Sequence, residues 1–215
     1  MTTVDPIPRG RGRTARLSRA ERAALSDEKL IQASLELIAE CGIERVTLRS
    51  IGERAGYSRG LVNYRFGTKE ALLKEATHRL VKRWAQEAFP TEGPEAEGIH
   101  ALRGFVARHG GSLDSLECRA YYTLVYAALG PMPELRQELA DVHVEIRQRL
   151  AAYIRQGIEA GDVRSDVDAG RYAAWIYGAV RGIAYQWFLD PEAVDLDSAY
   201  SELSHAIERS LVATS

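Results

Sequence analysis

From residue 26 onward the apolar residues recur at intervals of three and four positions, which is the period of one face of an α-helix. Leu30, Ala33, Leu37 and Cys41 show this spacing, and Gly42 then stops the pattern. No segment alternates apolar and polar residues as a half-buried strand does. The sequence therefore predicts an all-α fold of about nine helices.

The breaks between periodic segments give the expected boundaries. Helices are expected over residues 27–41, 48–55, 59–66, 69–89, 99–109, 116–129, 134–160, 167–189 and 197–212, and residues 90–98 are expected to form a loop. A helix over residues 69–89 would be about 30 Å long at its rise of 1.5 Å per residue, which is enough to connect two parts of the molecule.

Composition excludes several classes of protein. The chain has 215 residues, 46% hydrophobic and 27% charged, which suits a buried core. It has no run of about 18 apolar residues and no secretory signal at its start, so we expect a soluble cytoplasmic protein without a membrane partner. Cys41 and Cys118 have no second cysteine or histidine at metal-ligand spacing, so neither a metal site nor a cofactor is expected.

Charge is divided unevenly along the chain. Residues 1–84 contain 17 Lys and Arg against 10 Asp and Glu, a net charge of 17 − 10 = +7, and residues 85–215 contain 11 against 20, a net charge of 11 − 20 = −9. The split indicates a front part that meets a polyanion and a rear part that does not.

Residues 1–25 form a basic segment with no sustained period, and we expect a flexible arm there. Its Pro8-Arg-Gly-Arg-Gly-Arg13 run resembles the core of an AT-hook, in which Arg9, Arg11 and Arg13 would enter a minor groove. A disordered solubilising tail is the alternative. Ser18 and Glu21 have the spacing of a capping box, although the sustained helical pattern begins later.

Two short helices joined by a tight turn at Gly56 stand out after the first long helix. With that helix they match a helix-turn-helix unit, whose second helix fits the DNA major groove. The second helix presents Arg59, Leu61 and Asn63, side chains that suit guanine, a thymine methyl group and adenine respectively.

The segment Thr47-Leu-Arg-Ser-Ile-Gly-Glu-Arg-Ala-Gly-Tyr-Ser-Arg-Gly-Leu-Val-Asn-Tyr-Arg-Phe66, followed by Gly67-Thr-Lys-Glu-Ala-Leu-Leu73, resembles the DNA-binding segment of the tetracycline-repressor (TetR) family of bacterial transcription regulators. The resemblance implies a helix-turn-helix DNA-binding domain at residues 26–73, with its motif at 47–66, and a helical ligand-binding and dimerisation domain at residues 74–215. Gly52 stands where an alanine is frequent, and we expect it to loosen the first short helix slightly.

The resemblance also implies DNA-contacting positions. Those expected at base edges are Arg49, Arg59, Gly60, Leu61 and Asn63, and those expected at phosphates are Thr47, Tyr64, Arg65 and Lys69, with the N-terminus that Ser58 caps. Each also has a plainer interpretation, because Thr47 and Ser58 cap helices whether or not DNA binds and Lys69 is in a first helical turn.

Aromatic residues are frequent in the middle helices of the rear part, where the resemblance implies a ligand pocket. The candidate ligand-binding residues are Phe105, Tyr121, Tyr122, Tyr126, His143, Trp175 and Arg181. Aromatic residues at helical spacing are more often packing than ligand contacts, and a buried histidine is more often structural, so a core role for them stays open.

A strip of small residues in the penultimate helix, Ala174, Gly178 and Gly182, would let another helix approach closely. Leu203 and Ile207 lie on an apolar stripe of the last helix. Both helices are expected to form a four-helix interface in a homodimer, with an internal helix pair as the alternative.

These features together predict a ligand-responsive regulator, a repressor in most members of the family, that binds a palindromic DNA operator as a dimer and is released by a small, mostly apolar or aromatic effector. An all-α enzyme is disfavoured because the five histidines are scattered and no nucleophile or phosphate-binding motif occurs. A ligand-independent DNA-binding protein is disfavoured by the acidic rear part.

Overall fold

The computed structural model describes residues 18–89 and 97–212. Over these residues the chain forms nine α-helices and two short 3₁₀ helices and contains no strand, which confirms the all-α prediction. One isolated antiparallel bridge joins Val163 and Val212. The three arginines of the expected arm (Arg9, Arg11 and Arg13) lie outside the described residues, as does most of the expected loop at residues 90–98.

The first helix, α1 (Arg19–Cys41), begins earlier than the apolar period predicts. Ser18 caps it through a complete capping box, in which the Ser18 hydroxyl accepts from the Glu21 amide at 3.1 Å and the Glu21 carboxylate accepts from the Ser18 amide at 2.7 Å. Residues 19–25 are therefore helical and not part of an arm. The apolar period misses this turn because it is exposed to solvent, so its stability comes from capping instead of packing.

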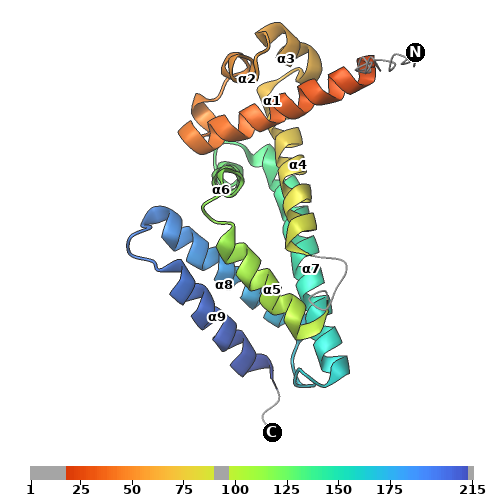
Figure 1. Cartoon of the computed structure of the whole chain (residues 1–215), viewed down its shortest axis with the longest axis vertical. Coiled ribbons are helices and arrows are strands. Elements are labelled where there is room, and N and C mark those ends of the chain that lie inside the picture. The colour runs from red at the N-terminus through yellow and green to blue at the C-terminus, as the bar shows by residue number, and fades with distance from the viewer. Residues whose placement is uncertain (1–17, 90–96, 213–215) are drawn as a thin grey trace, which may run out of the picture.

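Helices α2 (Leu48–Ala55) and α3 (Arg59–Phe66) lie together beside α1 at one end of the molecule (Figure 1). Thr47 and Ser58 cap them, accepting from the amides of Ser50 and Leu61. The side chains of Leu30, Ile51 and Val62 are fully buried where the three helices meet. This small apolar core fixes the orientation of α3 relative to α1.

Helix α4 (Lys69–Ala88) leads away from this end toward the other helices (Figure 1). Thr68 caps its start by accepting from the Ala71 amide at 3.1 Å. The helix contacts α1 and α3 as well as α5, α6 and α7. It is therefore the continuous connection that the sequence predicts.

The remaining helices surround the larger part of the apolar core, which is continuous with the part between α1, α2 and α3. These remaining helices are α5 (Gly98–Gly111), α6 (Leu116–Leu129), α7 (Arg136–Ala160), α8 (Ala169–Leu189) and α9 (Leu196–Leu211). The start of the expected helix at residue 134 is instead a 3₁₀ turn, Pro133–Leu135, since proline suits the first positions of a helix. Helix α6 also packs against α1, so the two ends of the molecule are joined by more than α4.

Candidate DNA interface and ligand cavity

The turn between α2 and α3 depends on two glycines. Gly56 ends α2 in the left-handed conformation, with φ of 76°, which residues with a Cβ atom rarely adopt. Gly52 of α2 packs closely against the turn and against α3. A Cβ atom at this position would come within 2.8 Å of the Tyr57 carbonyl oxygen and 3.2 Å of a Val62 methyl group. The sequence suggested that Gly52 only loosens α2, whereas in the structure its missing side chain permits the close approach of α3.

We predict that Gly52→Val lowers the free energy of unfolding by about 1–3 kcal/mol, the usual cost of overpacking. The matched control is Gly60→Val, because a Cβ atom at Gly60 makes only an ordinary contact, 3.7 Å from the Ser58 hydroxyl. Urea denaturation of both variants measures the difference. Equal stabilities would show that the α2–α3 turn accommodates a side chain at residue 52.

The outward face of α3 presents Arg59, Gly60, Asn63 and Tyr64, all exposed. The Tyr64 side chain is 76% exposed, which is unusual for a large aromatic residue with no partner to cover it. Arg59 forms no ion pair with any residue of the described ranges. This face thus offers a cation, an amide and an aromatic ring within two turns of one helix, a set suited to base edges and phosphates.

The other residues expected at DNA lie around this face. Leu61 is half-buried, Arg49 is exposed and bonded to Glu53 at 2.8 Å, and the hydroxyls of Thr47 and Ser58 accept from backbone amides as helix caps. Their contacts to DNA remain predictions.

Two of the expected phosphate-binding residues have partners within the chain. Arg65 donates from Nε to Asp27 of α1 at 2.6 Å and from Nη2 to the second oxygen of the same carboxylate. Lys69 donates to the Ile43 carbonyl oxygen at 2.7 Å. Arg65 therefore holds α3 against α1, and Lys69 holds the start of α4 against the 3₁₀ turn Ile43–Arg45 that follows α1. The sequence did not indicate either role.

A third internal contact was also missed. Arg54 of α2 donates to Glu40 of α1 at 2.7 and 2.9 Å and to Glu36 at 3.3 Å. These hydrogen bonds lower the pKa of the Glu40 carboxyl. Together with the Asp27–Arg65 pair they connect both helices of the motif to α1.

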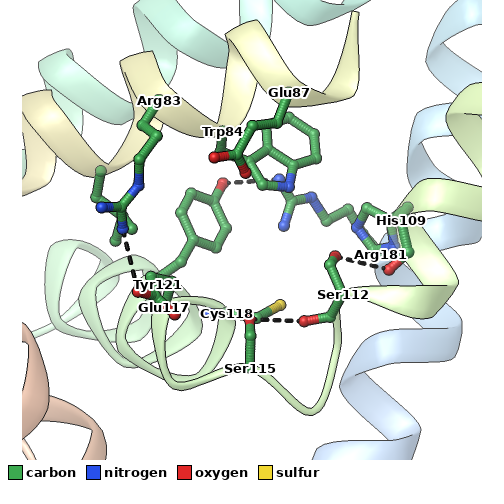
Figure 2. A pocket seen from close by; sticks show the side chains of 11 residues that line it. Arg83, Trp84, Glu87, His109, Ser112, Ser115, Glu117, Cys118, Tyr121 and Arg181 are labelled. Atoms are coloured by element: carbon green, nitrogen blue, oxygen red, sulfur yellow. Dashed lines mark hydrogen bonds and ion pairs between the residues drawn. The ribbon is translucent and has the colours of Figure 1, made fainter.

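A cavity of about 380 Å³ lies between α4, α5, α6 and α8. Its lining residues are Leu80, Arg83, Trp84, Glu87, His109, Ser112, Ser115, Glu117, Cys118, Tyr121 and Arg181 (Figure 2). The volume is within the range of small-molecule sites. Four of the residues belong to α4, the helix that begins directly after the DNA-binding motif.

Four aromatic rings surround the Arg181 guanidinium at the inner side of this cavity. The ring centres of Tyr121, Tyr177, Tyr122 and Trp84 lie 4.4, 4.8, 5.2 and 5.7 Å from Arg181 Cζ. Figure 2 shows the guanidinium extending toward Trp84 and the Tyr121 hydroxyl. Such distances are typical of cation–π interactions, which gain strength where water is excluded.

Most titratable groups near Arg181 are held neutral. Burial, opposed by Arg181, raises the pKa of the Cys118 thiol to about 11 and that of the Tyr122 hydroxyl to about 12. Burial and the Arg181 charge lower the pKa of His109, and they lower that of His143 to about 4. At neutral pH these thiol, phenol and imidazole groups are uncharged beside a permanent cation.

Of the seven ligand-binding residues expected from the sequence, Tyr121 and Arg181 line the cavity. Phe105 and Tyr122 are buried and do not line the cavity. His143 lies behind Tyr121, whose hydroxyl is 2.5 Å from His143 Nε2. Tyr126 and Trp175 are 44% exposed on the outer surface and do not line the cavity.

The residues expected at a dimer interface divide into two groups. Ala174 and Gly178 are exposed on α8, Gly182 is half-exposed, and a Cβ atom at either glycine would meet nothing within 4 Å. Leu203 and Ile207 of α9 are instead 8% and 1% exposed, so the apolar stripe of α9 packs mainly inward within the chain. The expected contribution of these two residues to an interface is thus limited by their burial.

The described ranges hold neither a metal-binding cluster nor a membrane-spanning helix. No group of three His, Cys, Asp or Glu side chains there is arranged to hold a metal ion. None of the described helices combines the length and apolar character needed to cross a bilayer.

Comparison with known proteins gives two family matches. The model for bacterial regulatory proteins of the tetR family matches residues 30–76, and the model for the C-terminal region of BetI-type transcriptional repressors matches residues 115–212. The first covers α2 and α3 and the second covers α6 to α9.

Individual relatives agree with these matches. The HTH-type transcriptional regulator TtgR of Pseudomonas putida is 24% identical over 82% of this chain and 86% of its own length. The HTH-type transcriptional regulator BetI of Burkholderia mallei is 41% identical over 37% of this chain and 41% of its own.

Two solved structures show the same fold. SmeT in complex with triclosan has a TM-score of 0.76 at 22% identity, covering 88% of this chain and 92% of that one. A putative transcriptional regulator of Saccharomonospora viridis in complex with choline also has a TM-score of 0.76 at 22% identity, covering 89% of this chain and 100% of that one.

Proposed function

Because the chain belongs to the tetR family of bacterial regulatory proteins, we propose that it is a repressor that binds an operator as a two-fold dimer and is released by a small molecule in its cavity. Members of this family are DNA-binding transcription factors and not enzymes. The observation that carries the proposal is the position of α4, which begins after the DNA-binding motif and supplies four side chains to the cavity wall.

In this proposal residues 26–73 form the DNA-binding domain, extended by the first turns of α1, and residues 74–215 bind the effector and the second subunit. The exposed residues of α3 enter the major groove, and the protein acts on bacterial DNA in the cytoplasm. Helix-turn-helix dimers bind half-sites about 34–36 Å apart, so the distance between the two α3 helices decides whether both half-sites are contacted.

An exposed apolar strip on α8 supports the dimer. Ala174, Trp175, Gly178, Tyr185 and Leu189 recur at helical spacing along one side, and the side chains of Trp175, Tyr185 and Leu189 are 44%, 46% and 69% exposed. Large exposed apolar side chains gathered on one helix are typical of an interaction surface. Since the strip contains small residues between the large ones, a second α8 can pack closely against it.

Two connections link the cavity to the DNA-binding end. Arg83 of α4 bonds to Glu117 of α6 at 3.2 Å, and both residues line the cavity. Helix α6 in turn packs against α1, which holds α3 through Asp27. A molecule that separates α4 from α6 would therefore displace α4, which follows α3 in the chain, and α1, which holds α3 through Asp27.

Small molecules bound to proteins of the same fold, triclosan in SmeT and choline in the Saccharomonospora viridis regulator, support an effector role for this cavity.

We predict reciprocal coupling between the two sites. Genome-wide mapping of bound DNA identifies an operator. Mobility-shift titrations then measure its affinity with and without compounds that change the tryptophan fluorescence of the parent chain but not that of a Trp84→Phe variant, since Trp84 is the tryptophan that lines the cavity. A compound that weakens operator binding tenfold must itself bind tenfold more weakly to the operator complex, a coupling of about 1.4 kcal/mol. If every compound that enters the cavity leaves operator affinity unchanged, the chain regulates transcription through its abundance and not through an effector.

A further inference from the structure

Within residues 18–89 and 97–212 the Arg181 guanidinium has no opposite charge beside it. No carboxylate of the described residues lies within 4 Å of it, and its Nη2 donates only to the hydroxyls of Tyr121 at 2.9 Å and Tyr177 at 2.6 Å. Its Nε is buried and forms no hydrogen bond of regular geometry, although the equally unpartnered Tyr122 hydroxyl lies close enough to interact with the guanidinium. A buried cation without a counter-ion is costly to retain, and an unpartnered donor adds to that cost.

The carboxylates that line the cavity do not supply the missing charge. Glu117 is bonded to Arg83 at 3.2 Å. Glu87 is exposed on α4. The thiol of Cys118 and the hydroxyls of Tyr121 and Tyr122 have raised pKa values, so they stay neutral at physiological pH. The inner side of the cavity is therefore positive.

The aromatic rings around Arg181 would by themselves suit a quaternary ammonium ligand, because ring faces attract cations. Here the chain's own guanidinium already lies 4.4 to 5.7 Å from the centres of those rings. A second cation would meet like charge in a site with little water. The guanidinium of Arg181 thus already occupies the position between the rings that a ligand cation would take. The charged group that would complement this site is an anion.

We infer, on the basis of the effector role proposed above, that the cavity binds an organic carboxylate with its anionic group on Arg181 and its apolar or aromatic part against Trp84 and Leu80. A guanidinium matches a carboxylate geometrically, since two parallel N–H donors face two oxygens. Nη2 is the only nitrogen of Arg181 that donates to the described residues, which leaves Nη1 to donate to such a ligand. The cavity volume of about 380 Å³ suits a small effector.

A bound carboxylate would also contact both α8 and α4. Arg181 belongs to α8, whereas Trp84 and Leu80 belong to α4. A ligand that contacts all three would connect α8, which carries the exposed strip, to the helix that begins after α3. The charge of the effector would thus be recognised between the α8 strip and the DNA-binding face of α3.

The test is calorimetric titration of the full chain with matched probes: phenylacetate, indole-3-acetate and octanoate, each against its primary amide, and choline as a cation. At least one carboxylate should bind ten or more times as tightly as its amide, a difference of about 1.4 kcal/mol. Arg181→Gln should remove this preference, and Arg181→Lys should retain part of it because it keeps the charge. The comparison of carboxylate with amide on the unaltered chain does not depend on how the variants fold.

Equal affinity for acids and amides, tighter binding of choline, or no binding of any carboxylate at millimolar concentration would overturn the inference. Operator binding is measured on the same preparations without probes. If the chain binds the operator but none of the carboxylates, the proposed regulator function holds and the inferred ligand class is wrong. If the chain binds neither the operator nor a carboxylate, both the proposed function and the inferred ligand class are wrong.

Discussion

Replacing Arg59 with alanine should reduce operator affinity by a hundredfold or more. Arg59 is exposed on the outer face of α3 and has no ion-pair partner among the described residues, so its cation is available to DNA. One good side-chain contact to a base edge contributes about 1–3 kcal/mol. In a symmetric dimer both subunits carry the substitution, so this binding free energy is lost at each of the two half-sites.

The matched control is Arg155→Ala, which removes the same charge from an exposed position on α7. Fluorescence anisotropy with labelled operator measures both variants, and their melting temperatures should equal that of the parent chain. If Arg59→Ala and Arg155→Ala bind operator equally well, Arg59 does not contact DNA. If both weaken binding alike, only net charge matters.

The second large effect is expected at Gly178. A Cβ atom at Gly178 meets nothing within 4 Å in the single chain, so Gly178→Glu should leave the subunit fold intact. In a dimer through α8 the same change would bury a carboxylate in an apolar interface, which is costly without a partner. We expect a monomeric protein whose operator affinity falls by about 10²–10⁴, because the advantage of binding two half-sites together is lost.

Analytical ultracentrifugation at micromolar concentration measures the assembly state. Ala107→Glu is the control, since it adds the same charge to an exposed position on α5. A parent chain that sediments as a monomer, or a Gly178→Glu variant that remains dimeric, would show that the α8 strip is not the interface.

Local features of the fold could be predicted from the sequence because they depend on neighbouring residues. Thr47 and Ser58 cap the N-termini of α2 and α3, as their position before each helix predicts. Gly56 ends α2 in the left-handed conformation, which favours glycine. The exposed set on α3 follows from the same spacing, since Val62 faces the core and Asn63 does not. Such rules act within a few positions of the chain.

Contacts between distant residues could not be predicted in this way. Asp27 lies 38 positions from Arg65, and Tyr121 lies 60 positions from Arg181, so only the packing of helices brings each pair together. Both arginines were expected to face a ligand or DNA, yet Arg65 pairs with an internal carboxylate and Arg181 pairs with none in the described part of the chain. Charge type alone does not distinguish a paired cation from an unpaired one.

The cavity wall was missed for a related reason. Ser112 and Ser115 fall between two expected helices and Glu117 falls in the first turn of the second, yet in the structure all three line the cavity. The aromatic residues that were expected there, Tyr126 and Trp175, are on the outer surface. Which side of a helix faces a cavity depends on the arrangement of its neighbours.

Selection of DNA from a random duplex pool by the purified full chain, followed by sequencing, tests the central claim most directly. A dimeric operator-binding regulator predicts enrichment of an inverted repeat whose half-site centres are about one helical turn, or a multiple of it, apart. The Arg59→Ala variant should enrich the same repeat with weaker preference at one base position in each half. A pool that remains random after selection, or enrichment without an inverted repeat, would contradict the account.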